Sequence, residues 1–394
     1  MEMWQFIDDM RIFYITDLVL DDRSAPSIHV DALCTQFAKL GHEVTLYAPR
    51  VEGFKRHTEA PPPYSIKILW SPRFLLSLFF QPRLLFTLWR DIRTARPDVV
   101  YARHSHLLIV PGIIGKLFKI PVLLEINGIL EQDAQHINQT MRSRILLAVG
   151  IFAVLEKVNA KFATRLIAVT DGIKEYFIVR YGIEPEKITV IPNGVDTEAF
   201  LPQPQPRSGT RIGYIGSLHA WQGVRYILEA AQLLPTLQFF IIGNGEERPA
   251  LESFIREHVL TNVELQPPIA HDAVATAINA CDICISYPLK FRDGATSPFK
   301  VYEYLACGKP VISSDLVSMR EEFGDVLTYA KAESAESLAE TIAQLVKNES
   351  ERTVLGAKGR AFVEKDHSWQ SVAQKIIALA TGKVEPFSRL NKAI

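Results

Sequence analysis

Short runs of β-branched and aromatic residues alternate with amphipathic helical patterns along this chain, and the whole series occurs twice. The first series comprises strand-like runs that begin near Arg11, Glu43, Ile66, Asp98, Pro121, Thr164 and Ile188. The second comprises runs that begin near Arg211, Leu237, Asn262, Ile283 and Pro310. Strands that alternate with helices form parallel sheets. The sequence therefore predicts an α/β protein with two Rossmann-like, doubly wound domains that face each other across a cleft.

A proline-rich polar segment separates the two series. Pro202, Pro204 and Pro206 exclude a regular helix there and favour a stiff connector. The domains that we expect are an N-terminal domain over 1–200, a linker over 201–210, a C-terminal domain over 211–367 and one more helix in 368–394. Ligands of such sheets bind beyond the carboxyl ends of the strands, so two facing sheets would hold both substrates between them.

The composition is that of an ordinary globular protein. Its 394 residues carry a formal net charge of −1, which gives no reason to expect a nucleic acid as partner. The four cysteines lie in apolar patterns without the second pair or the histidines that a zinc site would need, so we expect reduced thiols in the core. No basic stretch followed by an apolar one opens the chain, so we expect a cytoplasmic protein, whether Met1 or Met10 is the start.

The segment KVYEYLACGKPVISSD, which begins at Lys300, predicts a short helix, a stop at Gly308 and a buried strand. Ser297 is a good N-cap and Pro298 suits the first helical position, so free amides at this end would attract an anion. Lys300 adds a positive charge, and Glu303 could reach paired hydroxyls beyond the anion. A diphosphate with its ribose fits both groups, and the alternative is a surface helix with a solvated glutamate.

Four segments carry a family resemblance: VIPNGVDTEAFLP, IGSLHAWQGV, IIGNGEERPALE and KVYEYLACGKPVISSD. Their order and spacing resemble those of the family-four glycosyltransferases of the retaining GT-B group, over about residues 11–382. The resemblance implies an acceptor domain, then a nucleotide-sugar domain, and a final helix that crosses back to the first domain, with no metal and no cofactor. It implies a retaining hexosyltransferase that moves a sugar from a UDP- or GDP-sugar to a glycan or lipid-linked acceptor, in cell-surface polysaccharide or glycolipid synthesis.

Several residues take expected roles from this resemblance. Glu303 matches the family's ribose-binding glutamate, and Gly216 with Ser217 matches the glycine-rich turn beside the diphosphate. The family's other glutamate falls on Ala295, which leaves Asp293 as the nearest carboxylate. The full donor-binding set that we expect is Gly216, Ser217, Arg292, Asp293, Thr296, Ser297, Lys300, Glu303 and Asn193.

The charge beside the diphosphate also departs from the family pattern. The usual arginine and lysine fall on Ser217 and Gln222, although a leaving nucleoside diphosphate still needs positive charge near it. Lys300 and Arg292 are the candidates to supply that charge. Lys300 and Glu303 are therefore the catalytic candidates on the donor side.

On the acceptor side, many relatives carry a histidine after the strand that corresponds to VLLEIN, and this chain has Asn127. An asparagine orients a sugar hydroxyl but cannot shuttle a proton. Arg103 and His104, after the preceding strand, and Glu131 belong to the same expected edge of the sheet. Asn127 and His104 are catalytic candidates, and the alternatives are a structural histidine and a solvated loop acid at Glu131.

The segment that begins at Arg73 and ends at Arg93 combines large apolar side chains with arginines. It could lie in a membrane interface, which would make the protein peripheral on the inner face of the membrane. Pro82 and Arg83 interrupt it, so the alternative is a helix pair packed on the N-terminal sheet with solvated arginines. The uncharged run from Ile145 to Leu155 is about half of the ~20 residues that a spanning helix needs.

Two other functions stay open. A catalytically silent sensor or scaffold that binds sugar nucleotides would account for the departures at Ala295, Gln222 and Asn127, and a sugar-nucleotide epimerase would share the two-domain layout. A dehydrogenase is disfavoured because the turns at Gly213 and Gly243 do not form GxGxxG. The nucleotide base, the donor sugar, the acceptor, the linkage and the oligomeric state are open as well.

Overall fold

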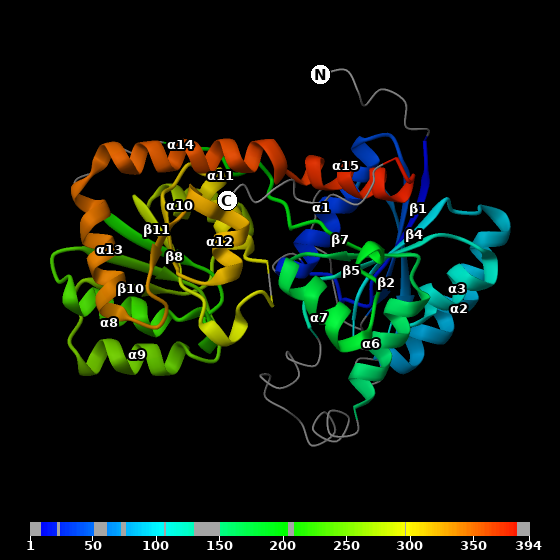
Figure 1. The fold of residues 1–394 in the computed structure, drawn as a ribbon, viewed down its shortest axis with the longest axis horizontal. Helices are drawn as coiled ribbons and strands as arrows, with labels where there is room; N and C mark the ends of the chain where they lie inside the picture. The colour runs from blue at the N-terminus through cyan, green and yellow to red at the C-terminus, as the bar shows by residue number, and fades with distance from the viewer. Residues whose placement is uncertain are drawn as a thin grey trace. The chain divides into compact units, whose positions relative to one another are not determined.

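The computed structural model describes residues 9–21, 24–50, 61–71, 76–105, 108–129, 150–203, 209–295 and 297–383. Contacts divide the chain into two compact units, one of Met1–Pro192 with Ala373–Ile394 and the other of Asn193–Val372. Each unit is built on one parallel sheet with helices on its faces (Figure 1). The predicted site residues Thr296 and Glu131 lie outside the described residues.

Within the described residues, the first unit holds a seven-stranded parallel sheet in the order β3-β2-β1-β4-β5-β6-β7. Its strands are β1 (Arg11–Ile15), β2 (Glu43–Arg50), β3 (Ser65–Trp70), β4 (Val99–Arg103), β5 (Val122–Ile126), β6 (Arg165–Ala168) and β7 (Ile188–Val190). Each coincides with a run that the sequence predicts as a strand. The strand order reverses between β1 and β4, so the loops after these two strands mark the switch point of the sheet.

Helices cover both faces of this sheet (Figure 1). They are α1 (Ala25–Lys39), α2 (Leu76–Thr94), α3 (Val110–Phe118), α6 (Ile151–Phe162), α7 (Asp171–Tyr181) and the 3-10 turn η2 (Pro185–Lys187). The helices α2, α3, α6 and α7 share one hydrophobic core with the sheet, in which Phe80, Ile114 and Phe177 are buried. Helix α1 packs on the opposite face, where the rings of Phe37 and Tyr101 lie 5.9 Å apart between centroids.

The described part of the segment from Arg73 to Arg93 forms one helix, α2, so the predicted interruption into a helix pair is wrong. Pro82 lies inside this helix and removes one backbone donor. Phe80, Leu84 and Leu88 recur at helical spacing and are all buried. Their burial against the sheet holds the helix continuous across the proline. In the part of the chain that the structure describes, no helix is both long and apolar enough to cross a bilayer.

The second unit holds a six-stranded parallel sheet in the order β10-β9-β8-β11-β12-β13. Its strands are β8 (Arg211–Ile215), β9 (Gln238–Ile242), β10 (Val263–Gln266), β11 (Ile283–Ser286), β12 (Val311–Ser314) and β13 (Thr328–Ala330). The sequence predicts all of them except β13. That strand has only three residues at the edge of the sheet, too few to show a period. The switch point of this sheet lies between β8 and β11.

Two hydrophobic cores flank the second sheet. Its helices are α8 (Val224–Leu233), α9 (Arg248–Glu257), α10 (His271–Asn279), α11 (Phe299–Ala306), α12 (Val317–Phe323), α13 (Ala335–Lys347) and α14 (Glu349–Asp366), with the 3-10 turns η3 (Ala220–Gln222), η4 (Lys290–Arg292) and η5 (Gly324–Val326). The last helix, α15 (Trp369–Ala380), is divided between the two units, because the second unit ends at Val372 and the first resumes at Ala373. The first core holds α8, α9 and α13, and the second holds α10, α11, α12 and α14. Strand β11 serves both, because Ile283 and Ile285 belong to the first core and Cys284 to the second. All four cysteines are free and buried, as predicted.

Helix α14 lies very close to α11 because glycines occupy the contact. A Cβ on Gly356 would lie 2.1 Å from the carbonyl oxygen of Gly308, and a Cβ on Gly359 would lie 2.5 Å from a methyl carbon of Leu305. Gly308 has a φ of 65° and follows the last turn of α11, which confirms the predicted stop. This packing fixes α11, the helix of the KVYEYLACG segment, on the second sheet.

Candidate functional site

Two glycine-containing loops meet at the carboxyl ends of β8 and β9. The amide of Leu218 donates a hydrogen bond of 2.8 Å to the carbonyl of Asn244. A Cβ on Gly243 would lie 1.8 Å from the carbonyl oxygen of Gly216, and one on Gly245 would lie 2.3 Å from that of Leu218. The two backbones therefore touch directly, which only glycine at both positions permits. The predicted turn at Gly216 is thus held by its neighbour.

Lys300, in the first turn of α11, lies against this turn. Its Nζ donates hydrogen bonds of 2.7 Å to the Tyr214 hydroxyl and 2.6 Å to Gln222 Oε1. It also lies 4.2 Å from the centroid of the Tyr214 ring. A Cβ on Gly216 would lie 2.9 Å from Nζ, so the ammonium fills the space that the glycine leaves. Burial lowers the pKa of Lys300 to about 7, although the negative charge of Glu303 acts in the opposite direction and raises it.

Glu303 lies one turn further along α11 and is half-buried. Burial raises the pKa of its carboxyl to about 7, and the nearby charge of Lys300 opposes that rise. Among the described residues, no group hydrogen-bonds this carboxylate. A half-buried carboxyl without a protein donor is suited to accept hydrogen bonds from ligand hydroxyls. The structure therefore brings together Gly216, Lys300 and Glu303, and the sequence did not identify Tyr214, a strand residue, as their neighbour.

The helix entrance differs from the predicted one. Helix α11 begins at Phe299, its N-cap residue is Pro298, and no side chain caps it. The prediction that Ser297 is the N-cap and Pro298 the first helical residue is therefore wrong. Pro298 has extended backbone angles, and the Ser297 hydroxyl instead lies 3.4 Å from the hydroxyl of Tyr302. No side chain at the N-cap position, Pro298, therefore accepts a hydrogen bond from the first amides of α11.

Asp293 and Arg292 belong to the short turn η4 and its end. The Asp293 carboxylate accepts hydrogen bonds from the amides of Val317 at 3.1 Å and Ser318 at 3.0 Å. It thus caps α12, and its expected contact with a sugar stays a prediction. Arg292 is buried, and its guanidinium lies 5.3 Å from the centroid of the Trp221 ring.

Ser217 and Asn193 complete the predicted donor set within the described residues. The carbonyl oxygen of Ser217 accepts a hydrogen bond of 2.6 Å from the Tyr214 hydroxyl, which fixes the turn after β8. Asn193 is buried, and its Oδ1 has no hydrogen-bond partner among the residues that the structure describes. A buried carbonyl oxygen of this kind can accept from a ligand.

A buried ionic cluster lies in the first unit at the carboxyl end of β5. Glu125 Oε1 lies 2.8 Å from His29 Nε2, and Glu125 Oε2 lies 3.6 Å from an Arg103 nitrogen. Burial by itself raises the pKa of Glu125, but His29, Arg103 and Asn127 together lower it to about 2. Sequence reasoning missed Glu125 and His29. The signal available was one carboxylate inside the apolar strand VLLEI.

The acceptor-side candidates surround this cluster. His104 is buried, its amide donates a hydrogen bond of 2.7 Å to the Glu125 carbonyl, and its ring meets the Phe177 ring edge-on at 6.1 Å. Asn127 lies near enough to Glu125 to lower the pKa of its carboxyl. The structure thus places Arg103, His104 and Asn127 together at one edge of the first sheet. In the described ranges, no group of three or more His, Cys, Asp or Glu residues could hold a metal ion.

Comparison with known proteins gives concordant matches in both units. Residues 27–199 match the family model "Glycosyltransferase Family 4" and residues 209–348 match "Glycosyl transferases group 1". An uncharacterized glycosyltransferase of Methanocaldococcus jannaschii is 26% identical over 277 residues, which cover 68% of this chain and 71% of that protein. The UDP-Gal:alpha-D-GlcNAc-diphosphoundecaprenol alpha-1,3-galactosyltransferase of Escherichia coli is 28% identical over 189 residues, 43% of this chain and 46% of the enzyme. The chain therefore spans about half the length of that second relative.

A solved structure agrees with the fold. The crystal structure of Anabaena HepE in complex with UDP-glucose superposes with a TM-score of 0.72 at 16% identity, and the match covers 95% of this chain and 100% of that one. At this identity the likeness shows the fold alone. That fold is the two-domain Rossmann-like architecture of the GT-B group, as the sequence predicts.

Proposed function

We propose that this chain, which belongs to the family 4 and group 1 glycosyltransferases, is a retaining enzyme that uses a UDP- or GDP-sugar as donor. The acceptor that we propose is a glycan or a lipid-linked glycan precursor. The observation that carries the proposal is the cluster of Gly216, Lys300 and Glu303 at the switch point of the second sheet. It offers a cation and a carboxyl that none of the described residues hydrogen-bonds.

The donor would lie with its diphosphate against Lys300 and the turn at Gly216. Both phosphates carry negative charge, and Lys300 is a half-buried ammonium already held by two neutral partners, Tyr214 and Gln222. Neutral partners orient the ammonium but leave its charge for the ligand. The Glu303 carboxylate would accept from the two ribose hydroxyls, as its missing protein donors suggest.

The reaction would retain the configuration of the sugar. The bond from the sugar to the diphosphate breaks, the bond to the acceptor oxygen forms on the same face, and the acceptor proton passes to the departing phosphate oxygen. Negative charge grows on that phosphate as the bond breaks, and Lys300 would stabilise it. Because the phosphate takes the proton, Asn127 and His104 need only position the acceptor, and no protein base or metal is required by this scheme.

Names of relatives support the choice of donor and acceptor. The Escherichia coli relative is named for UDP-Gal and for a diphosphoundecaprenol acceptor, and Anabaena HepE was solved with UDP-glucose. We therefore propose a UDP-sugar before a GDP-sugar, and an acceptor on the first unit near Arg103, His104 and Asn127. We also propose a cytoplasmic location for this chain.

Calorimetry with UDP, GDP and ADP tests the donor site. The wild-type chain should bind one of these nucleotides, and Glu303→Gln should weaken that binding by about tenfold or more, because a carboxylate accepts from hydroxyls more strongly than an amide. Glu340→Gln, at an exposed position of α13, is the matched control and should bind like the wild type. Unchanged affinity in Glu303→Gln would remove the ribose assignment.

A silent sugar-nucleotide sensor is the second candidate. It is favoured by one observation, the neutral Gln222 that contacts Lys300 where the family usually places a charge. Tight nucleotide binding without donor hydrolysis or transfer, in a screen with mixed glycan and lipid-linked acceptors, would establish the sensor. Turnover of any donor would exclude it.

A further inference from the structure

An apolar and aromatic surface lies exposed on the outer strand and helix of the first unit. We define the aromatic face by Ile68 and Trp70 of β3 and by Phe79, Leu85, Phe86 and Trp89 of α2. Phe86 is 64% exposed and Trp70 is 49% exposed. A groove of about 480 Å³ runs between β3 and α2 and includes Trp70, Phe79 and Phe86 in its lining. Exposed apolar side chains gathered in one place mark an interaction surface more often than scattered ones do.

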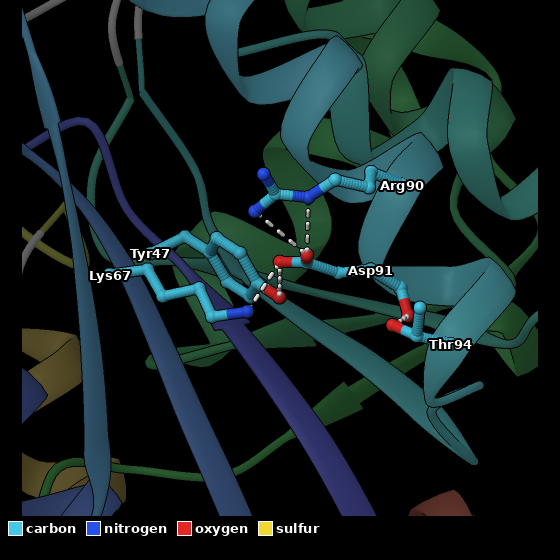
Figure 2. Close-up of polar contacts among 5 residues, drawn as sticks. All are labelled: Tyr47, Lys67, Arg90, Asp91 and Thr94. Atoms are coloured by element: carbon cyan, nitrogen blue, oxygen red, sulfur yellow. Dashed lines mark hydrogen bonds and ion pairs between the residues drawn. The ribbon is translucent and has the colours of Figure 1, made fainter.

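The orientation of this face is set by a buried polar anchor on the other side of α2. Figure 2 shows Tyr47 and Lys67 reaching from the sheet toward Asp91 of the helix. The Asp91 carboxylate accepts from the Tyr47 hydroxyl at 3.0 Å, from Lys67 Nζ at 2.6 Å and from the Arg90 guanidinium at 3.3 Å. Together with the buried Phe80, this anchor prevents α2 from rotating. This packing therefore keeps the aromatic side chains on the outer side of α2 exposed to solvent.

Arginines are interleaved with the aromatic rings at helical spacing. The Arg83 guanidinium lies 5.2 Å from the Trp70 ring centroid and 5.6 Å from that of Phe79. The Arg93 guanidinium lies 3.7 Å from the Trp89 ring centroid. In each pair the guanidinium lies over the aromatic ring, whose negative face attracts the positive charge.

Among the residues that the structure describes, no acidic side chain forms an ion pair with Arg83 or Arg93 of this face. Asp91 is the only acid within the described part of α2, and it is buried and shared by Tyr47, Lys67 and Arg90. Asp98, the next acid along the chain, accepts the amide of Arg11. An apolar centre rimmed by cations is complementary to a bilayer that carries anionic lipid.

We propose that the aromatic face is the docking surface for a membrane that contains anionic lipid. The rings of Trp70, Phe79 and Phe86 enter the boundary between headgroups and acyl chains, and Arg83 and Arg93 meet lipid phosphates. Aromatic rings prefer this depth because one part is apolar and the edge is polar. The inference goes beyond the proposed transfer reaction, because a protein of any activity that carries this face would bind such a surface.

Vesicle co-sedimentation of the full chain tests the proposal. Vesicles of phosphatidylcholine alone are compared with vesicles that also contain phosphatidylglycerol, each at low and at high salt. The wild-type chain should bind the anionic vesicles at low salt and lose binding as salt rises, because salt screens exposed charges. Absence of binding to anionic vesicles at low salt overturns the proposal.

Two pairs of substitutions separate the contributions. Phe86→Gln with Trp89→Gln should reduce binding by about tenfold or more, since both rings leave the interface. Arg83→Gln with Arg93→Gln should reduce it by about fivefold for each arginine and flatten the salt dependence. The matched control is Val179→Ser with Val354→Ser, two exposed apolar residues on other surfaces, which should bind like the wild type.

Two control measurements, the thermal unfolding temperature and the UDP affinity, show whether each variant is folded and has an intact donor site. All variants should keep the thermal unfolding temperature and the UDP affinity of the wild type, because none of the substituted residues lies at the donor site. Vesicle binding that survives both pairs of substitutions overturns the assignment of this face. Self-association that depends on Phe86 and Trp89, without vesicle binding, assigns the face to a protein contact and also overturns it. If the wild-type chain does not bind UDP, that result counts against the proposed donor site and leaves the membrane assignment to the vesicle assay.

Discussion

Lys300 Nζ donates a hydrogen bond of 2.6 Å to Gln222 Oε1, and this contact ties the first turn of α11 to the 3-10 turn η3 that follows β8. The two residues are 78 positions apart in the sequence. Gln222 satisfies one donor of the ammonium and adds no negative charge. Lys300 thus brings positive charge to the second switch point while neutral groups hold it in place, and burial lowers its pKa to about 7.

Removing the ammonium tests this arrangement directly. Lys300→Met keeps most of the side-chain volume, and we expect the affinity for UDP to fall by about 10- to 100-fold, because a charge-assisted hydrogen bond contributes about 1.5–3 kcal/mol. Calorimetry measures the change. Lys347→Met, at the exposed end of α13, is the control and should leave the affinity unchanged. Equal affinity in Lys300→Met and the wild type would contradict the placement of the diphosphate.

Two glycines at the same site should respond differently to alanine. In Gly216→Ala the new methyl group meets the Lys300 ammonium at 2.9 Å, and this flexible side chain can move aside. Gly216 has a φ of 157°, which residues with a side chain rarely adopt, so we expect a loss of about 1 kcal/mol in the free energy of unfolding from backbone strain. We also expect about tenfold weaker UDP binding, since the lysine is displaced. In Gly243→Ala the methyl group would lie 1.8 Å from the backbone carbonyl oxygen of Gly216, so we expect a loss of about 2 kcal/mol or more in the free energy of unfolding.

Urea denaturation and calorimetry on both glycine variants separate these outcomes. If Gly243→Ala unfolds at the same urea concentration as the wild type, the two loops do not touch as described. If Gly216→Ala binds UDP normally, the ammonium has another position from which it can hold the ligand.

Nucleotide affinity should have a maximum near neutral pH. Glu303 has its pKa raised to about 7, so the carboxylate that would accept ribose hydroxyls forms only as the pH rises through that value. Lys300 has its pKa lowered to about 7, so the charge that would hold the diphosphate is lost as the pH rises further. Calorimetry between about pH 5 and pH 9 should show both limbs. In Glu303→Gln the acidic limb should disappear and the alkaline limb remain, and an identical profile in that variant would refute the ribose role.

The buried cluster around Glu125 should make stability depend on acid. The folded pKa of Glu125 is about 2 against a usual 4.5, so its stabilising contribution is complete above pH 4.5 and is lost as the pH falls toward 2. The difference corresponds to about 3 kcal/mol. Glu125→Gln should lose this pH dependence and be destabilised at pH 7 by about 3–5 kcal/mol, because Arg103 is left buried without its carboxylate.

The exposed pair of Arg11 and Glu43 provides the comparison for Glu125. Glu43 is 63% exposed, so Glu43→Gln should cost no more than about 1 kcal/mol at pH 7. Urea denaturation at several pH values measures both variants. A wild-type stability that stays constant from neutral to acid pH would contradict the ionic cluster.

The acceptor side has its own test at Asn127. Asn127→Ala removes an amide that can orient a sugar hydroxyl, and we expect kcat to fall by about tenfold or more while UDP affinity stays the same. Transfer is followed with the proposed donor and a mixture of glycan and lipid-linked acceptors. His104→Gln keeps a hydrogen-bonding side chain, so a much larger loss of kcat there than in Asn127→Ala would show that proton transfer by the histidine is needed after all.

The residue pattern within single segments was sufficient to predict most of the strands and the end of helix α11. Parallel strands that are buried on both faces must be continuous apolar runs, so RIFYI, VLLEI and RIGYI could be recognised without any partner. The stop of α11 was equally local, because a glycine with a φ of 65° ends the helix wherever the rest of the chain lies. Lys300 and Glu303 were found for the same reason, since their separation on one helix places them near each other before any tertiary contact forms.

Contacts between distant segments decided the rest. His29 and Glu125 meet only because α1 and β5 pack together, and neither residue shows in its own segment that it will lie in a buried polar contact. Asp293 is a candidate sugar ligand on sequence grounds, and only the folded chain shows that its carboxylate also accepts hydrogen bonds from two amides of α12. Helix α2 stays continuous across Pro82 and keeps its rings exposed because Asp91, Tyr47 and Lys67 come together from three elements. Whether a charged or aromatic side chain is buried, paired or exposed depends on residues from distant segments, and these residues come together only when the chain folds.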